Sequence, residues 1–410
     1  MKRAVRRTAG ARTACVGVIG LALLLGGCSG PAPRDRARAH PAHEQQMRQF
    51  AQRGYPAQAR HAFDTATDRW SVDGGEIDIV LLVPTPHEKG ADGPFPLVLY
   101  LPGLGESAAA GSFWREAWAS AGYAVASVQP AANGPAFRNL PDARNGDMTR
   151  IARKQFGSES LNVRVAAVRF VHRELTRRAS QGNPPYARIA PSRFVVTGYD
   201  LGAQTAYALA GEQSPQRTAS PALPGIQGAV ALSPYVVAAA GGFEQRYAAI
   251  RTPTLSVTGA EDRDSHGIGT SPSARQAPFR FGTGPAHLLT LDGISHRTLA
   301  GNPDDPANDS GDRKESAPRA SQREAPGPSR GEGGRRGQAG GPQGDGPSGG
   351  NGMSQIPHAL ADVARQRIAV QQVTLAFLDA TLRDDAIARE WLERNAPAWL
   401  DPIAGLQTRK

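Results

Sequence analysis

The sequence predicts an α/β protein whose central sheet is mostly parallel and is covered by helices on both faces. Two observations lead to this prediction. Short apolar runs that end in polar turns alternate along the chain with longer segments of helical periodicity, as expected of parallel strands joined by helical crossovers. In addition, residues 96–103, PLVLYLPG, form a continuous apolar run that ends in Pro-Gly, which is typical of a strand buried on both faces.

The first residues of the chain resemble a bacterial lipoprotein signal. Five basic residues precede an apolar run over residues 16–25, which is too short to cross a membrane as a helix. The run ends in LGGC, and in signals of this kind the cysteine is acylated and becomes the new N-terminus. The resemblance therefore implies a signal peptide over residues 1–27, lipidation of Cys28 and attachment to the bacterial cell envelope. Ser29 after the cysteine favours the outer membrane over the inner one.

Removal of the signal changes both the charge and the cysteine content. The chain has 47 Lys and Arg against 37 Asp and Glu, so the loss of five basic residues lowers the formal net charge from +10 to about +5. A balance this small, spread along the chain, gives no reason to expect nucleic acid as a partner. The second cysteine, Cys15, lies within the signal, so the mature chain has no disulfide.

The remaining chain is predicted to be one domain on a tether. Residues 28–42 are rich in Pro, Arg and Ala and would link the lipid to a domain over residues 43–410. Residues 301–355 contain almost no aliphatic side chains and are predicted to be a disordered insertion, because they cannot bury enough apolar surface to offset the entropy of ordering. Helices over residues 358–382 and 387–392 follow, so the insertion lies inside the domain.

The first part of the domain is predicted to begin with two short helices over residues 43–67. A hairpin over residues 70–84 would follow, with its turn at residues 73–75. After the apolar run over residues 96–103, a helix over residues 113–121 and a strand over residues 123–128 imply a parallel pair with a right-handed crossover.

The middle of the domain is predicted to continue the alternation. Residues 129–157 resemble a loop, and residues 161–178 a helix whose apolar side chains face the sheet while its arginines face water. Three later strands, over residues 226–232, 254–257 and 287–291, each end in a turn that carries polar side chains. Since the carboxyl ends of parallel strands meet at one edge of a sheet, we expect these turns to converge on one crevice.

The stretch 193–211, RFVVTGYDLGAQTAYALAG, predicts a strand, a sharp turn and a helix in succession. Gly198 and Gly202 lie two residues to either side of Asp200. Glycines in this frame indicate a corner too tight for a β-carbon, which would place Asp200 at the positive N-terminal end of a helix. The alternative is that Asp200 only caps the helix that begins at Leu201.

Polar residues at three strand ends suggest a catalytic set. Asp200, Asp262 and His296 occur in the chain order nucleophile, acid, histidine. His266 is an alternative to His296, and Asp264 and Glu261 are alternatives to Asp262. The same EDRDSH segment admits a metal site of the Asp-x-Asp-x-His type, but a short cluster without a distant partner rarely completes a coordination shell. We therefore predict no metal and no cofactor.

From about residue 77 to residue 392 the chain resembles the α/β-hydrolase superfamily, in its capless branch of predicted dienelactone hydrolases and platelet-activating-factor acetylhydrolases. The segments that carry the resemblance are PLVLYLPGLGES, SAGYAVASVQP, FVVTGYDLGAQTAYALAGE, GAVALSP, LSVTGAEDRD and LDGISHRTLAG. It implies the α/β-hydrolase fold without a large cap domain. It also implies Asp200 at the nucleophile position, His296 as the base and Asp262 as the acid that orients the imidazole.

The resemblance further implies an oxyanion hole made by the backbone amides of Leu104 and Leu201. Tyr235, just past a strand end, would either reach the pocket or pack beside it. The departure from the family is aspartate in place of the nucleophilic serine. A carboxylate is already charged at neutral pH and attacks carbon directly, giving an ester to the protein that histidine-activated water then cleaves.

Three functions remain open from the sequence. The first is an envelope-anchored hydrolase that acts through an Asp-His-Asp triad on a small ester-like or activated substrate. The second is a binding protein of the same fold without turnover. The third is a dehalogenase or epoxide hydrolase, although Leu201 stands where such dehalogenases carry Trp or Arg, and residues 233–253 are too short for the cap whose tyrosines epoxide hydrolases use. In each case we expect a small molecule and the lipid membrane as the partners.

Overall fold

The computed structural model describes residues 44–56, 60–72, 75–87, 93–139, 141–213, 222–237, 242–303 and 355–410. Its internal contacts divide the chain into two compact units, Met1–Gln45 and Gln46–Lys410. The signal peptide, Cys28, the tether and nearly all of the insertion predicted over residues 301–355 lie outside the described residues. Among the residues that are described, no helix is both long and apolar enough to span a bilayer.

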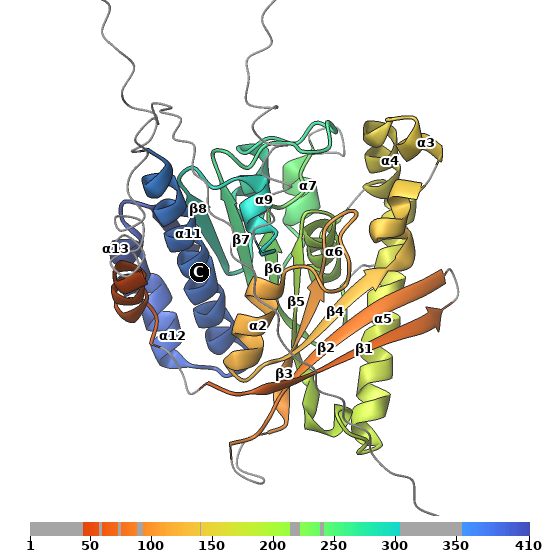
Figure 1. Ribbon diagram of the computed structural model, residues 1–410, viewed down its shortest axis with the longest axis horizontal. Helices are drawn as coiled ribbons and strands as arrows, with labels where there is room; N and C mark the ends of the chain where they lie inside the picture. The colour runs from red at the N-terminus through yellow and green to blue at the C-terminus, as the bar shows by residue number, and fades with distance from the viewer. Residues whose placement is uncertain are drawn as a thin grey trace, which may run out of the picture. The chain divides into compact units, whose positions relative to one another are not determined.

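The second unit is built on one sheet, in which the described strands follow the order β1-β2-β4-β3-β5-β6-β7-β8-β9 (Figure 1). The strands are β1 Phe63–Val72, β2 Gly75–Pro84, β3 Phe95–Leu101, β4 Ala124–Pro130, β5 Ile189–Tyr199, β6 Ile226–Leu232, β7 Thr254–Gly259, β8 Ala286–Leu291 and β9 Ala404–Arg409. The strands from β4 across to β8 are parallel to one another. The antiparallel pairs are β1 with β2, β2 with β4 and β8 with β9. The prediction of a mostly parallel sheet is confirmed.

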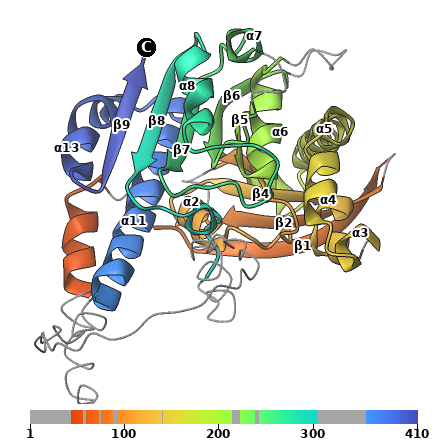
Figure 2. The same ribbon diagram turned by 90° about the horizontal axis from the view of Figure 1, so that it is seen from above.

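Helices cover both faces of this sheet, as predicted. Helices α2 (Ser112–Ser120) and α11 (Gln355–Leu382) lie on one face, and α5 (Ser158–Ser180) and α6 (Leu201–Ala210) on the other (Figure 2). The other described helices are α3 Pro141–Arg144, α4 Met148–Gln155, α7 Phe243–Tyr247, α8 Ala277–Phe281, α9 His296–Leu299, α12 Ala386–Glu390 and α13 Ala396–Leu400. Between β6 and β7 the described residues contain only α7, which has five residues, so this part of the chain builds no cap.

The alternation of side chains along the central strands divides the core into two layers. In β5, Val195 packs into the layer formed with α2 and α11, whereas Val196 packs into the layer formed with α5 and α6. Both side chains are fully buried. A strand covered on both faces has no position that favours a polar residue, which explains the continuous apolar runs of the sequence.

Two sequence predictions are wrong in part, and one strand was not predicted. Residues 63–67 lie in β1 rather than in a second helix, because β1 pairs with β2 along its whole length, from Phe63 opposite Pro84 to Val72 opposite Gly75. Residues 129–157 hold α3, α4 and two 3-10 turns where a loop was expected. Strand β9 was not predicted, since its sequence AGLQTR lacks an apolar run and it gains its pairing from β8.

The sequence predicted that the arginines of α5 face water, but not all of them do. Arg164 is 4 % exposed, and its guanidinium donates hydrogen bonds to Thr205 Oγ1 (2.8 Å), Gln204 Oε1 (2.6 Å) and the carbonyl oxygen of Gln155 (2.5 Å). Burial lowers the pKa of Arg164 to about 9, against the opposing effect of the charge on Asp200. A cation is therefore held beneath the first turn of α6, on the side of the sheet where α5 and α6 meet.

We expect Trp118→Ala to lower the free energy of unfolding by about 3–5 kcal/mol, because it leaves a cavity between α2, the sheet and α11. Trp118 is fully buried, and its indole N–H donates to Thr374 Oγ1 at 3.1 Å. Val163→Ala is the control, because Val163 is 50 % exposed on α5, and its loss should change stability by less than about 0.5 kcal/mol. Chemical denaturation of both variants measures this. If both variants lowered the free energy of unfolding by the same amount, the layer formed by the sheet with α2 and α11 would not be packed as described.

Candidate active site

The sharp turn between β5 and α6 is formed as the glycine spacing predicted. Asp200 occupies the corner with φ 52° and ψ −109°, a conformation that non-glycine residues rarely adopt. A β-carbon at Gly198 would lie 2.3 Å from the backbone of Gly202, and one at Gly202 would lie 1.9 Å from the carbonyl oxygen of Leu101. Only glycine fits at these two positions, so the corner can form only with this pair.

The Asp200 side chain does not cap α6, since it makes no hydrogen bond to the first-turn amides of the helix. Its carboxylate lies at the carboxyl end of β5, at the edge of the sheet where the sequence predicted a crevice. The Leu104 N–H donates to Oδ2 at 3.2 Å, and His266 Nε2 lies 3.0 Å from the same oxygen. The other oxygen, Oδ1, lies 3.7 Å from His296 Nε2. The two carboxylate oxygens therefore face different partners.

Charge holds this carboxylate ionised although the residue is only 3 % exposed. Burial by itself would raise the pKa of Asp200, but the charge and hydrogen bond of His266, the charge of His296 and the Leu104 amide outweigh it and hold the pKa well below its usual value. For His266, burial disfavours the imidazolium, and the neighbouring Asp200 more than compensates, so its pKa is raised. Asp200 and His266 thus stabilise each other's charged forms.

His296 is held from its other nitrogen by a buried acid. His296 Nδ1 lies 2.9 Å from Asp262 Oδ1, and Asp262 is fully buried. The hydroxyl of Ser233 donates to Asp262 Oδ1 at 2.8 Å and also lies 2.8 Å from His296 Nδ1. With Nδ1 engaged in this way, the Nε2 atom of His296 points at Asp200, which is the orientation that a general base requires.

The structure distinguishes Asp262 from its neighbours in the same turn. Asp262 Oδ2 also accepts a hydrogen bond from the Thr258 hydroxyl at 2.8 Å, and Arg275 Nε lies 3.4 Å away. Asp264 instead accepts hydrogen bonds from backbone amides of its own loop. Glu261 pairs on the surface with Arg263. Among the three acids considered from the sequence, Asp262 alone contacts His296.

The two amides predicted to form the oxyanion hole differ in their contacts with Asp200. The Leu104 amide reaches Asp200, but no hydrogen bond of the described residues joins the Leu201 amide to that carboxylate. The Leu201 side chain packs in a small apolar cluster with Ala152 and Phe156, which Leu104 and Tyr235 flank. The ring centroids of Tyr235 and Phe156 lie 4.1 Å apart, and burial raises the pKa of Tyr235 to about 12, so Tyr235 packs beside Phe156 with a neutral hydroxyl.

A surface pocket of about 530 Å³ opens beside this set of residues. His296, Tyr199, Arg297, Glu106 and Asn302 form part of its wall. Glu106 accepts hydrogen bonds from the Gly103 amide (2.8 Å) and from the Asn302 side chain (2.7 Å). Burial nevertheless raises the pKa of Glu106 to about 7. A small molecule bound here would contact His296 and the Glu106 carboxyl, whereas Asp200 is not among the residues that line this pocket.

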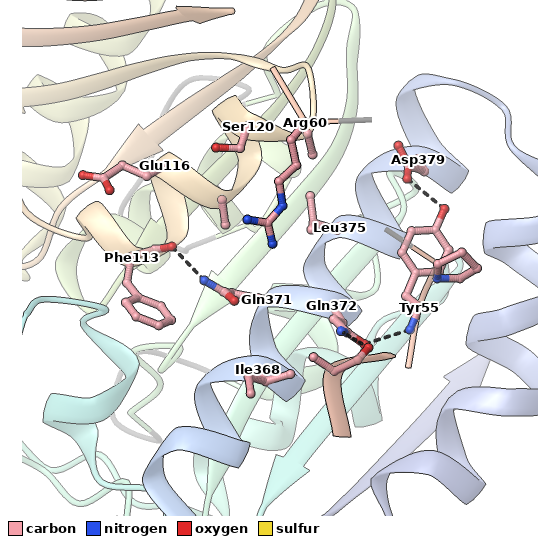
Figure 3. Close-up of a pocket in the computed structure, with 14 residues that line it drawn as sticks. Tyr55, Arg60, Phe113, Glu116, Ser120, Ile368, Gln371, Gln372, Leu375 and Asp379 are labelled. Carbon is pink, nitrogen blue, oxygen red and sulfur yellow. Dashed lines mark hydrogen bonds between the residues drawn. The ribbon is translucent and has the colours of Figure 1, made fainter. Parts of the chain in front are cut away.

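A second pocket, of about 440 Å³, lies between α2 and α11 (Figure 3). The polar groups that the figure joins by dashed lines bond to one another: the Tyr55 hydroxyl donates to Asp379 Oδ2 at 2.8 Å, and Gln371 Nε2 donates to the Phe113 carbonyl oxygen at 3.1 Å. None of its lining residues belongs to the predicted catalytic set. This pocket is therefore separate from the site around Asp200.

Three members of this crevice were not recognised from the sequence. His266 was considered only as a substitute for His296, whereas both histidines contact Asp200. The bridging position of Ser233 and the raised pKa of Glu106 were not foreseen. The position of Ser233 immediately after β6, and of Glu106 in the turn after β3, was the available signal, because both turns end at the same edge of the sheet.

Gly202→Ala should lower the free energy of unfolding by more than about 2 kcal/mol, because the added methyl group collides with backbone that cannot move aside cheaply. Gly405→Ala in β9 is a matched control, since a β-carbon there has nothing within 4 Å. Thermal and denaturant unfolding of the two variants provide the comparison. A Gly202→Ala protein as stable as the control would mean that the corner is looser than described.

In comparisons with known proteins, the chain matches no protein-family model, and no curated protein shows significant similarity to it.

Proposed function

We propose that the protein is a hydrolase of the α/β-hydrolase superfamily that acts on a small activated substrate through Asp200, His296 and Asp262. The observation that carries the proposal is that the two oxygens of the Asp200 carboxylate have different partners. Oδ2 accepts the Leu104 N–H at 3.2 Å, while Oδ1 faces His296 Nε2 at 3.7 Å. One oxygen is thus anchored and the other is available to react.

In the first step of the proposed reaction, Asp200 Oδ1 attacks an electrophilic carbon of the substrate. A carbon–oxygen bond forms, the bond to the leaving group breaks, and the leaving group departs with the electron pair. The product of this step is an ester between the substrate and Asp200. No proton has to be removed from the nucleophile, which suits a group whose pKa is held low.

In the second step, His296 Nε2 accepts a proton from water, and the hydroxide attacks the carbonyl carbon of that ester. Negative charge develops on Oδ2, where the Leu104 amide and His266 stabilise it. Asp262 stabilises the imidazolium of His296. The imidazolium then returns the proton to the departing alkoxide, which leaves as the alcohol. The carboxylic acid that remains at Asp200 releases its proton to solvent, as its low pKa favours, and the carboxylate is restored.

The chemistry of the carboxylate limits the substrates. Attack on an ordinary ester would give an anhydride, a poor intermediate, so we propose a substrate with a good leaving group on a saturated carbon. An activated ester is the alternative, cleaved by water that His296 deprotonates directly. The pocket of about 530 Å³ beside His296 would hold a small molecule. A lipid anchor at Cys28 and a place in the bacterial envelope remain part of the proposal on the strength of the sequence.

Once a panel of esters, halides and epoxides has yielded a substrate, a single turnover in oxygen-18 water should place the label in the peptide that contains Asp200. Direct attack by water would leave that peptide unlabelled. His296→Gln should block the second step and accumulate the substrate ester, visible as a mass increase on Asp200. His287→Gln is the control, because His287 lies in β8 and contacts Thr408. An unlabelled Asp200 together with no adduct would reject the covalent route.

A binding protein without turnover is the second candidate. It is favoured by one observation: Asp200 Oδ2 already accepts the hydrogen bond of the Leu104 N–H, so this amide is not available to the oxyanion of an ordinary ester. This candidate predicts no turnover on the panel and retention of a ligand in the crevice.

Asp200→Ser removes the carboxylate and frees the Leu104 amide. We expect this variant to gain hydrolysis of simple nitrophenyl esters, by at least about tenfold over the parent, because serine beside His296 and a free donor restores the parts that ester cleavage needs. Asp200→Ala is the matched control and should show no gain. If the serine variant does not exceed the alanine variant, the base or the oxyanion donor is not functional.

A further inference from the structure

Three side chains from distant parts of the chain converge at the corner. Asp200 follows β5, His266 lies in the loop after β7, and His296 begins α9. One carboxylate oxygen and two imidazole nitrogens from these residues all lie within 4.8 Å of one another. In the described part of the chain this is a set of one acid and two histidines whose donor atoms point at a common position.

We propose that Asp200, His266 and His296 bind a divalent transition-metal ion, with zinc as the best match. Two imidazoles and one carboxylate are donors that zinc accepts, and they leave a fourth position for water. Ligands of one tetrahedral zinc ion lie about 3.3 Å apart when each bond is about 2.0 Å. The separations of 3.0 Å from His266 Nε2 to Asp200 Oδ2 and of 3.7 Å from His296 Nε2 to Asp200 Oδ1 are close to that value, although each is measured to a different oxygen of the carboxylate.

The two histidine nitrogens lie within 4.8 Å of one another. Two donors of one tetrahedral ion lie about 3.3 Å apart, so a pair at that limit has to approach by about 1.5 Å. His266 can supply this movement, because its side chain is 21 % exposed and lies on a loop, whereas Asp200 and His296 are fixed by their other bonds.

The residues behind these ligands are those that orient ligands in metal sites. Asp262 and the Ser233 hydroxyl hold His296 Nδ1, which leaves the lone pair of Nε2 directed at the common position. The Leu104 amide fixes one oxygen of Asp200. A carboxylate behind a histidine ligand sets its tautomer and raises its basicity.

The sequence alone argued against a metal because the EDRDSH segment offered no distant partner. The structure changes the ligand set: Asp262 and Asp264 do not face the common position, since one holds His296 and the other bonds the backbone of its own loop. His266 remains from that segment, and Asp200 and His296 are the distant partners it lacked.

Metal binding and the proposed hydrolysis exclude one another. The ion takes an oxygen of Asp200 and the Nε2 lone pair of His296, which the hydrolysis uses as nucleophile and base. The metal site rests on the convergence of the three side chains and not on the proposed function, so either can fail without the other.

The test is titration of the full-length protein with Co²⁺, followed by its visible absorption, and with Zn²⁺, followed by calorimetry. We expect one ion per chain and visible bands of the intensity that four-coordinate Co²⁺ gives. His266→Gln should weaken binding at least about tenfold, and Asp262→Asn should weaken it about 10–100-fold although it removes no ligand. His287→Gln is the control and should bind like the parent.

His266→Gln is the decisive variant, because a change on a partly exposed loop leaves the fold intact and circular dichroism can verify this. Both cysteines are common to the parent and the variant, so a difference between them reports on the histidine. Equal affinity of the two proteins, or no saturable binding below about 1 mM, would overturn the proposal. Binding of metal by a protein that hydrolyses nothing would support the metal site and reject the proposed hydrolysis.

Discussion

The crevice depends on keeping a buried carboxylate charged at a strained corner. Removing a carboxylate from water is costly unless hydrogen-bond donors and opposite charges replace the lost solvation. At Asp200 these are the Leu104 amide and the imidazoles of His266 and His296. Each comes from a different strand end, so the charge is stabilised only when the strands lie in the observed order. The glycines on either side of the corner meet the steric requirement, and the three donors meet the electrostatic one.

The rest of the fold positions those donors. The parallel strands β3, β5, β6, β7 and β8 bring five turns to one edge of the sheet, and the helices on both faces bury the apolar side chains that fix the order of the strands. Asp262 contacts Thr258, Ser233 and Arg275 in addition to His296. The imidazole is therefore oriented by a buried network and not by a single hydrogen bond. Such orientation costs no reorganisation at the moment of reaction, which is what a catalytic base or a metal ligand needs.

Much of this was accessible from the sequence because it is local. The corner follows from the glycine frame around Asp200, and the apolar runs with their polar turns gave the strands that end at Asp262 and His296. What could not be predicted is non-local. Arg164 is buried because Gln204 and Thr205 of α6 accept its hydrogen bonds. Strand β9 exists through its pairing with β8. His266 matters only because its loop folds back over the corner, a contact that spacing along the chain does not encode.

The central claim is that Asp200 presents a free carboxylate oxygen to His296 while the other oxygen is anchored. A high-resolution crystal structure of the protein tests this most directly and requires no substrate. The account predicts Asp200 Oδ2 on the Leu104 amide and Oδ1 within about 4 Å of His296 Nε2, as in the present separation of 3.7 Å. An Asp200 side chain turned onto the first-turn amides of α6, with His296 directed away from it, would contradict the account.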